Sequence, residues 1–278
     1  MGFKQFLRHE YTVHLDETSS IEDWEKNQPG KAYFDLHIGT IEQHERAAPT
    51  FREFLGRGGK KILESGCGTG RWMAFFEKLG NRAFGIDDSW GPLRTARRHD
   101  PDMNLARADV LHAPFLSNSF DAAFSSYVAE HFEEGPEALF REIHRVLKPD
   151  ALFFVVVPFN NTLRRFVVNP ALMLLQRYWL SKGRQLGFTE FRYSKDDMDG
   201  FLRRTGFEIL DVRPDDFFPP WAKGMYCDLC DLGCFLDYEP KPPYEFGAFG
   251  RAVASLIRSV GIWHSCGGIF YIARARKT

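Results

Sequence analysis

ESGCGTG, residues 64–70, is the stretch that decides how this chain folds, and it places three glycines in five positions. The apolar pair Ile62 and Leu63 leads into it, and a helix-like stretch begins directly behind it at Arg71. Glycine has no Cβ atom and tolerates a positive φ, so a loop of this kind lets another group approach the backbone closely. The loop therefore predicts a binding site between a strand and a helix.

The spacing of the glycines excludes two common nucleotide-binding loops. The phosphate loop of nucleotide hydrolases ends in Gly-Lys-Ser or Gly-Lys-Thr, whereas Gly70 is followed by Arg71. The dinucleotide loop G-x-G-x-x-G needs a third glycine, but that position is Arg71 when counted from Gly66 and Met73 when counted from Gly68. The pattern here is G-x-G-x-G, one residue tighter and preceded by an acidic residue.

Apolar, strand-like runs alternate with helical stretches from about residue 60 to residue 157. We expect helices over 70–79, 89–98 and 134–147, between the strand-like runs KKILES (60–65), RAFGID (82–87), NLARAD (104–109), FDAAFSSY (120–127) and ALFFVVVP (151–158). The last run is almost continuously apolar, as is typical of a strand covered on both faces. Strand, helix and strand at this spacing predict a parallel sheet with right-handed crossovers.

The remaining segments predict one α/β domain with additions. We expect an N-terminal extension over 1–56 that packs on the core, with a helix over 41–56, and a domain over 57–278 that carries insertions at about 159–192 and 214–247. The first insertion holds a helix with Asn169 as its cap and Pro170 at its first position. Further elements are a helix capped by Ser194 and ended by Gly206, a strand FEILDV (207–212), a helix over 247–260 and a final strand GGIFYIARA (267–275).

Composition narrows the classes of partner. The net charge of −1 gives no general attraction to nucleic acid, so no nucleic-acid partner is expected, and short basic clusters are more typical of solvated surface. The longest apolar run, LFFVVVPF, is far too short to span a membrane, and the N-terminal stretch has no signal-peptide pattern, so a cytoplasmic protein is expected. The 27 phenylalanines are enough to fill a core and to line an apolar pocket.

The five cysteines do not form a clear metal-binding or disulfide pattern. An odd number without a secretory signal argues against a disulfide framework. Cys227, Cys230 and Cys234 could suggest a metal site, but a fourth ligand is missing nearby, and their spacing would put the three sulfurs on one face of a helix. We expect them to be reduced, metal-free core residues.

Four segments in a fixed order carry a family resemblance. ESGCGTG is followed by FGIDDS, RADVLHAPF and SFDAAFSSYVAEHF, and together with LFREIHRVLKPDALFFVVVP they cover about residues 60–157. This set resembles the class I S-adenosylmethionine-dependent methyltransferases, in particular the ubiquinone/menaquinone-type methyltransferase-domain group. The resemblance implies a Rossmann-like, seven-stranded, mostly parallel sheet with helices on both faces. It also implies S-adenosyl-L-methionine as cofactor and S-adenosyl-L-homocysteine as product.

The same resemblance assigns roles to single residues. Asp87 would accept hydrogen bonds from both ribose hydroxyls, although Asp88 could do so instead of capping the next helix with Ser89. Asp109 and Val110 would hold the adenine, unless Asp109 only closes a turn. The other implied cofactor-binding residues are Glu64 near the methionine ammonium, the loop residues Gly66, Cys67, Gly68 and Gly70, and Ser125 and Ser126 at the end of the fourth strand.

The resemblance predicts methyl transfer by in-line displacement to a small-molecule acceptor. His131 is a candidate general base, with packing or loop fixing as the alternative role. Both insertions are rich in aromatic and aliphatic residues, so we expect them to form a cap over a hydrophobic or aromatic acceptor. Two alternatives remain open: an RNA or protein methyltransferase, and a methyltransferase-like protein that binds the cofactor without catalysis.

Overall fold

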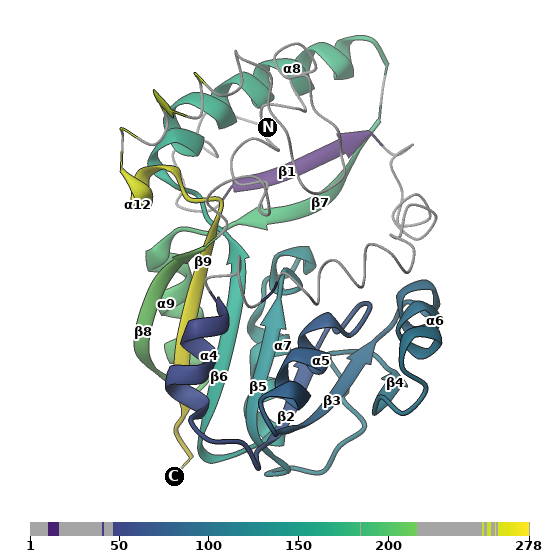
Figure 1. Ribbon diagram of the computed structural model, residues 1–278. Helices are drawn as coiled ribbons and strands as arrows, with labels where there is room; N and C mark the ends of the chain where they lie inside the picture. The colour runs from purple at the N-terminus through teal and green to yellow at the C-terminus, as the bar shows by residue number, and fades with distance from the viewer. Residues whose placement is uncertain are drawn as a thin grey trace. The chain divides into compact units, whose positions relative to one another are not determined.

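The computed structural model describes residues 11–16, 41, 47–183, 185–215, 252, 255–256, 259 and 261–277 of the 278-residue chain. The chain divides into two compact units (Figure 1). The core unit comprises Thr18–Val156, Asp199–Val212 and Tyr271–Thr278, and the second unit comprises Met1–Glu17, Val157–Met198 and Arg213–Phe270. Each unit is described by itself.

A seven-stranded sheet forms the centre of the fold, as the family resemblance implies, and its strand order is β4-β3-β2-β5-β6-β9-β8. The pairings of β2 with β3, β2 with β5, β3 with β4 and β5 with β6 are all parallel. Because parallel strands need a crossover between them, the helices fall on the faces of the sheet. The strands are β2 (Lys61–Ser65), β3 (Arg82–Asp87), β4 (Leu105–Arg107), β5 (Phe120–Ser126), β6 (Leu147–Pro158), β8 (Phe207–Asp215) and β9 (Gly268–Ala275).

Helices pack on both faces of this sheet. Phe154 of β6 contacts Phe51 of α4, whereas its neighbour Phe153 contacts Phe140 of α7. Successive residues of a strand point to opposite faces, so α4 and α7 lie on opposite sides. Phe51 also contacts Phe76 of α5, which places α5 on the α4 side (Figure 1). The helices of this region are α4 (Ala47–Leu55), α5 (Arg71–Lys78), α6 (Trp90–His99), α7 (Glu137–Val146) and α9 (Lys195–Arg204).

The expected capping residues are found at both ends of α9 but not at the start of α8 (Asn169–Ser181). The Ser194 hydroxyl accepts a hydrogen bond from the Asp197 amide at the start of α9, and Gly206 follows that helix with a φ of 92°, both as predicted. Asn169 is not a cap. It has helical angles because the π-turn η2 (Arg164–Val168) continues directly into α8, and its side-chain amide donates to Asn160 Oδ1 instead.

The second unit contains a two-stranded sheet that the sequence analysis did not predict. β1 (Tyr11–Asp16) pairs antiparallel with β7 (Leu186–Arg192), with an irregularity between Val13 and His14. β1 lies in the expected N-terminal extension and β7 in the expected first insertion. The short helix α12 (Ile262–Ser265) precedes β9.

Several predictions fall on residues outside the described part of the chain. Most of the second insertion, 214–247, lies there, as do Cys227, Cys230 and Cys234. Of the expected helix over 247–260, the four described residues are helical. None of the described helices is long and apolar enough to cross a membrane. The described residues also contain no group of three or more His, Cys, Asp or Glu side chains that could hold a metal ion.

Candidate active site

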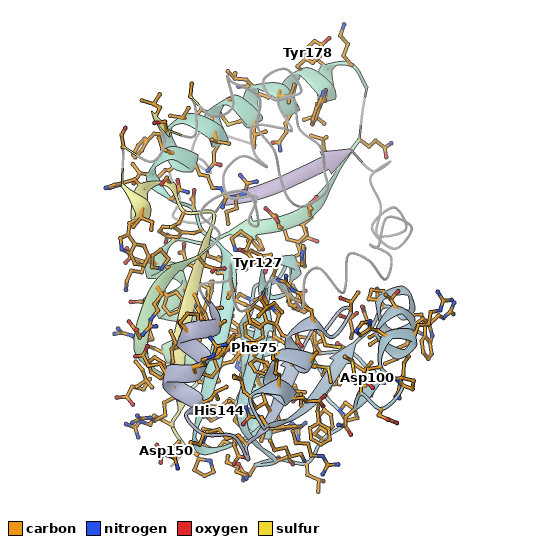
Figure 2. All side chains as sticks on the ribbon, viewed as in Figure 1. Phe75, Asp100, Tyr127, His144, Asp150 and Tyr178 are labelled. Carbon is orange, nitrogen blue, oxygen red and sulfur yellow. The ribbon has the colours of Figure 1, made fainter. Side chains whose placement is uncertain are left out.

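The residues expected to bind the cofactor gather at the carboxyl edge of the parallel strands. Glu64 is the penultimate residue of β2, Asp87 ends β3, and Asp109 follows β4. Ser125 and Ser126 end β5. Tyr127, directly after β5, marks this edge, and Figure 2 shows His144 and Asp150 at the opposite edge. Ligands of open parallel sheets bind at the carboxyl edge, next to the point where the strand order reverses. That point lies between β2 and β5: the strands β3 and β4 continue outward from β2, and β6 continues in the other direction from β5.

The three glycines of the loop have different surroundings. Gly66, Gly68 and Gly70 all have positive φ, with values of 78°, 51° and 73°. A Cβ atom on Gly66 would lie 2.2 Å from Cγ2 of Val128, and one on Gly70 would lie 2.9 Å from the Met103 sulfur. A Cβ atom on Gly68 would have no heavy atom of a described residue within 4 Å. Packing against Val128 and the positive φ disfavour a side chain at 66, and the positive φ and the Met103 contact disfavour one at 70, whereas no described atom would contact a side chain at 68.

Asp87 ties this loop to β3. The Gly68 amide donates to Asp87 Oδ2 at 2.8 Å, and the Ser89 amide donates to Oδ1 at 2.9 Å. Burial raises the pKa of Asp87, and these two amide hydrogen bonds oppose that increase. Ser89 occupies the cap position of α6, but its side chain makes no capping hydrogen bond. Asp88 is exposed, and its carbonyl oxygen accepts from Arg107.

Asp109 closes a turn, the simpler of its two expected roles. Its Oδ1 accepts from the Leu111 amide at 2.8 Å, and Oδ2 lies 2.7 Å from Nδ1 of His112. The hydrogen bond with His112 lowers the pKa of Asp109. Each carboxylate oxygen has two lone pairs, so both can accept a further hydrogen bond. The Val110 amide makes no hydrogen bond to a described residue.

The chain after β5 carries backbone strain that sequence reasoning missed. Tyr127 has a φ of 54°, an uncommon value for a residue with a Cβ atom, and its amide donates to the Val156 carbonyl. This bend brings Val128 against Gly66. The 3-10 turn η1 (Ala129–His131) follows, in which His131 is half exposed with Nε2 3.9 Å from Oε1 of the buried Glu130.

An ion pair on α7, which the sequence analysis did not predict, holds the loop that carries Asp109. Glu142 of α7 accepts the Ala113 amide at 2.7 Å and pairs with Arg145, which donates to the carbonyl oxygens of Ala113 and Phe115. The i, i+3 spacing of Glu142 and Arg145 predicts a helix-surface ion pair, but gives no indication that the pair reaches a loop about 30 residues earlier.

Comparison with known proteins identifies the family. Residues 63–155 match the sequence profile of the methyltransferase domain. The 2-phytyl-1,4-naphtoquinone methyltransferase of Nostoc punctiforme is 30% identical over 180 residues, which cover 57% of this chain and 76% of that protein. This chain belongs to the class I S-adenosylmethionine-dependent methyltransferases.

Other relatives match shorter parts of this chain. The demethylmenaquinone methyltransferase of Corynebacterium kroppenstedtii is 37% identical over 91 residues, which cover 33% of this chain and 38% of that protein. The chain spans 20% to 65% of the length of three further curated relatives. A crystal structure of geranyl diphosphate C-methyltransferase from Streptomyces coelicolor has a TM-score of 0.55 at 14% identity, covering 96% of this chain and 92% of that chain. Likeness at this identity shows the Rossmann-like fold.

The cofactor of this methyltransferase family, S-adenosylmethionine, presents an ammonium, a carboxylate, a sulfonium, a ribose and an adenine. The carboxyl edge offers polar atoms that suit such a ligand. Glu64 Oε2, Ser65 Oγ and Ser125 Oγ are buried and have no hydrogen-bond partner among the described residues. Burial raises the pKa of Glu64 well above its ordinary value, while Arg71 and the Met73 amide oppose the increase. Buried polar atoms without partners are rare, and a ligand with hydrogen-bond donors and acceptors would satisfy them.

Proposed function

We propose that this methyltransferase transfers the methyl group of S-adenosylmethionine to a small hydrophobic or aromatic acceptor. The observation that supports this most strongly is the glycine loop. Within the described part of the chain, Gly68 has no atom near its missing Cβ, and acceptor atoms of Glu64 and Ser125 are buried without partners at the same edge of the sheet. The Gly68 amide is held by Asp87.

In this proposal different residues bind different parts of the cofactor. Asp87 accepts from the ribose hydroxyls through the lone pairs that the two amides leave free, and Asp109 and Val110 hold the adenine. Glu64 attracts the ammonium, and the positive charge of that group would favour the ionised carboxylate despite its burial. The loop Gly66–Gly70, with Cys67, and the ends of β5 at Ser125 and Ser126 would contact the methionine part. Asp88 and Ser89 form the start of α6 beside the ribose.

When bound, S-adenosylmethionine supplies a methyl group on a positively charged sulfur. The chain's own contribution is to align the acceptor with the bond that breaks and to exclude water. His131 would remove a proton from a hydroxyl acceptor. Its half-exposed position leaves the imidazole in contact with solvent, which can accept the proton after the reaction.

The acceptor class rests on composition and on the relatives. The stretch after β6 exposes large apolar side chains, among them Phe166, Leu174 and Tyr178. Two relatives are named for quinone acceptors: a 2-phytyl-1,4-naphtoquinone methyltransferase and a demethylmenaquinone methyltransferase. These two observations favour an aromatic, hydrophobic acceptor over RNA or protein.

A methyl-transfer assay with labelled S-adenosylmethionine tests the proposal. The panel should contain reduced naphthoquinones, simple phenols, fatty acyl acids, total RNA and an unfolded protein mixture. We expect label in the quinol or phenol fraction, with formation of S-adenosylhomocysteine, and a fall in kcat with a changed pH profile for His131→Gln. Labelling of RNA or protein alone would overturn the acceptor class, and binding of the cofactor without transfer to any acceptor would overturn the activity.

A further inference from the structure

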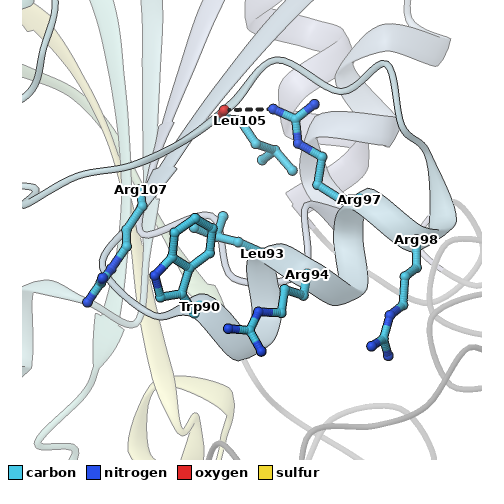
Figure 3. A pocket seen from close by; sticks show the side chains of 7 residues that line it. All are labelled: Trp90, Leu93, Arg94, Arg97, Arg98, Leu105 and Arg107. Atoms are coloured by element: carbon cyan, nitrogen blue, oxygen red, sulfur yellow. Dashed lines mark hydrogen bonds between the residues drawn. The ribbon is translucent and has the colours of Figure 1, made fainter.

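A cavity of about 440 Å³ lies between α6 and the edge strand β4, and none of its lining residues belongs to the glycine loop (Figure 3). Four arginines line it together with Trp90 and two leucines, and no acidic residue is among the lining residues. The arginines are Arg94, Arg97, Arg98 and Arg107. None of the cofactor-binding assignments uses this cavity.

Helix geometry gathers these side chains on one surface. Trp90, Arg94 and Arg98 are spaced at i, i+4 and i+8 along α6, so they form one row. Arg94 and Arg98 are exposed, and Trp90 is 49% exposed, an unusual degree for so large an apolar side chain. Like charges four residues apart on a helix repel each other. α6 contains no acidic residue that would offset this repulsion.

Other contacts hold the arginines in place without neutralising them. Arg97 donates to the carbonyl oxygens of Pro101 and Leu105 at 2.9 and 3.0 Å, and Arg107 donates to the carbonyl of Asp88 at 2.7 Å. The guanidinium groups of Arg94 and Arg107 lie 5.8 and 5.5 Å from the ring centre of Trp90. A guanidinium that stacks on an aromatic ring loses mobility but keeps its N–H edge available for an anion.

The positive charge of this cavity is not balanced within the described part of the chain. None of the four arginines forms a salt bridge with a described carboxylate. Arg97 and Arg98 in the last turn of α6 suit the negative end of the helix dipole, but that effect does not extend to Arg94 or Arg107. Four guanidinium groups around one cavity are therefore better explained by an anionic ligand than by the helix dipole.

We propose that this cavity binds a ligand with two or more phosphate groups, at a site separate from the cofactor. Phosphate oxygens match the fork of N–H donors on arginine, and two or more phosphates can engage several guanidinium groups at once. Arg94 and Arg98, which make no hydrogen bond to a described residue, supply the free donors. Arg97 and Arg107, held by backbone carbonyl oxygens, and Trp90 form the rest of the polar and aromatic lining. The phosphates can belong to a small free molecule or to a nucleic-acid strand.

Calorimetry with inorganic pyrophosphate and with a short single-stranded RNA tests the proposal, each in saturating S-adenosylhomocysteine so that the cofactor site is filled. We expect the wild-type protein to bind at least one of the two probes, more weakly as salt rises. The double variant Arg94→Gln/Arg98→Gln should bind that probe at least tenfold more weakly and bind S-adenosylhomocysteine unchanged. Pyrophosphate binding without RNA binding would indicate a small free ligand, and the reverse a strand.

A matched control removes the same charge elsewhere on the core unit. Arg57 and Arg141 are also exposed, and neither lines the cavity. The control Arg57→Gln/Arg141→Gln should keep wild-type affinity for the probe. The proposal is overturned if neither probe binds, if the Arg94/Arg98 variant binds as wild type does, or if the control loses as much affinity. Because S-adenosylhomocysteine is titrated into each variant in a separate experiment, a failure of the cofactor site is seen independently of the probe.

Discussion

Asp87 illustrates how a single carboxylate can serve both the fold and the ligand. It accepts one amide from the glycine loop and one from the start of α6, which fixes the loop next to the end of β3. Its neighbour Asp88 is exposed and uses only its backbone carbonyl in a described hydrogen bond. The two residues therefore form a matched pair for testing which of them binds the ribose.

Replacing Asp87 with alanine should weaken the binding of S-adenosylhomocysteine by about 1.5–3 kcal/mol, or roughly 10- to 150-fold. The variant loses hydrogen bonds to a charged acceptor and the tie to Gly68. The same change at Asp88 should alter affinity by less than about 0.5 kcal/mol, as for other surface substitutions. Titration calorimetry measures both. A larger effect at Asp88 than at Asp87 would transfer the ribose role to Asp88.

Gly66 and Gly68 should respond differently to alanine. At Gly66 a Cβ atom would clash with Val128 at 2.2 Å and would keep a positive φ, so we expect a loss of about 2–4 kcal/mol in the free energy of unfolding. At Gly68 only the positive φ is unfavourable, at about 1–2 kcal/mol, but the new methyl group would point into open space. Gly68→Ala should thus remain folded and lose cofactor affinity. Denaturant unfolding and calorimetry on both variants check this, and wild-type affinity in Gly68→Ala would show that the cofactor does not lie against this glycine.

At the scale of elements, helix α7 holds the loop behind β4 in place. Glu142 accepts the Ala113 amide and two hydrogen bonds from Arg145, and Arg145 holds two carbonyl oxygens of the same loop. This loop begins at Asp109, so the clamp positions an expected adenine-binding residue without touching the ligand.

Glu142→Gln should lower the free energy of unfolding by about 1 kcal/mol at neutral pH. The hydrogen bonds from Arg145 hold the pKa of Glu142 below its ordinary value. The folded state therefore binds a proton less readily than the unfolded state, and this stabilisation exists above the unfolded pKa of about 4.3. It is lost as the pH falls through the lower, folded pKa. The difference between wild type and variant should shrink over that acidic range in urea unfolding, whereas Glu134→Gln, at an exposed position, should match wild type throughout. A difference that is constant with pH would contradict the ion-pair explanation.

Helix α4 is joined to the sheet through aromatic packing. Phe51 is fully buried, and its ring lies 4.9 Å from those of Phe76 and Phe154 and 5.0 Å from that of Phe124. Phe51→Ala should cost about 3–5 kcal/mol through lost burial and the cavity left behind. Phe54 is only partly buried, and 6.4 Å separate its ring from that of Phe154, so Phe54→Ala should cost less. Equal losses in denaturant unfolding would show that α4 does not depend on Phe51.

At the scale of the whole molecule, local signals predict the core unit well and distant pairings poorly. β2, β3, β5 and β9 follow from apolar runs, and the edge where Glu64, Asp87 and Asp109 meet follows from the rule for parallel strands. The pairing of β1 with β7 joins segments that lie far apart in the sequence, and β7 (LGFTEFR) does not alternate regularly. β1 (YTVHLD) alternates apolar and polar residues, a strand signal that the sequence analysis did not use. The contact of Val128 with Gly66 depends on the strained bend at Tyr127, for which the sequence gives no indication. The arginine cavity needs both α6 and β4 in place before its lining residues come together.

We propose that the glycine loop and Asp87 form one site for S-adenosylmethionine and not for a dinucleotide. Titration calorimetry of the wild-type protein with S-adenosylmethionine, S-adenosylhomocysteine and NAD tests this directly. We expect one site per chain for the first two ligands, competition between them, and no measurable binding of NAD. Absence of binding to both S-adenosyl compounds, or tighter binding of NAD, would contradict it.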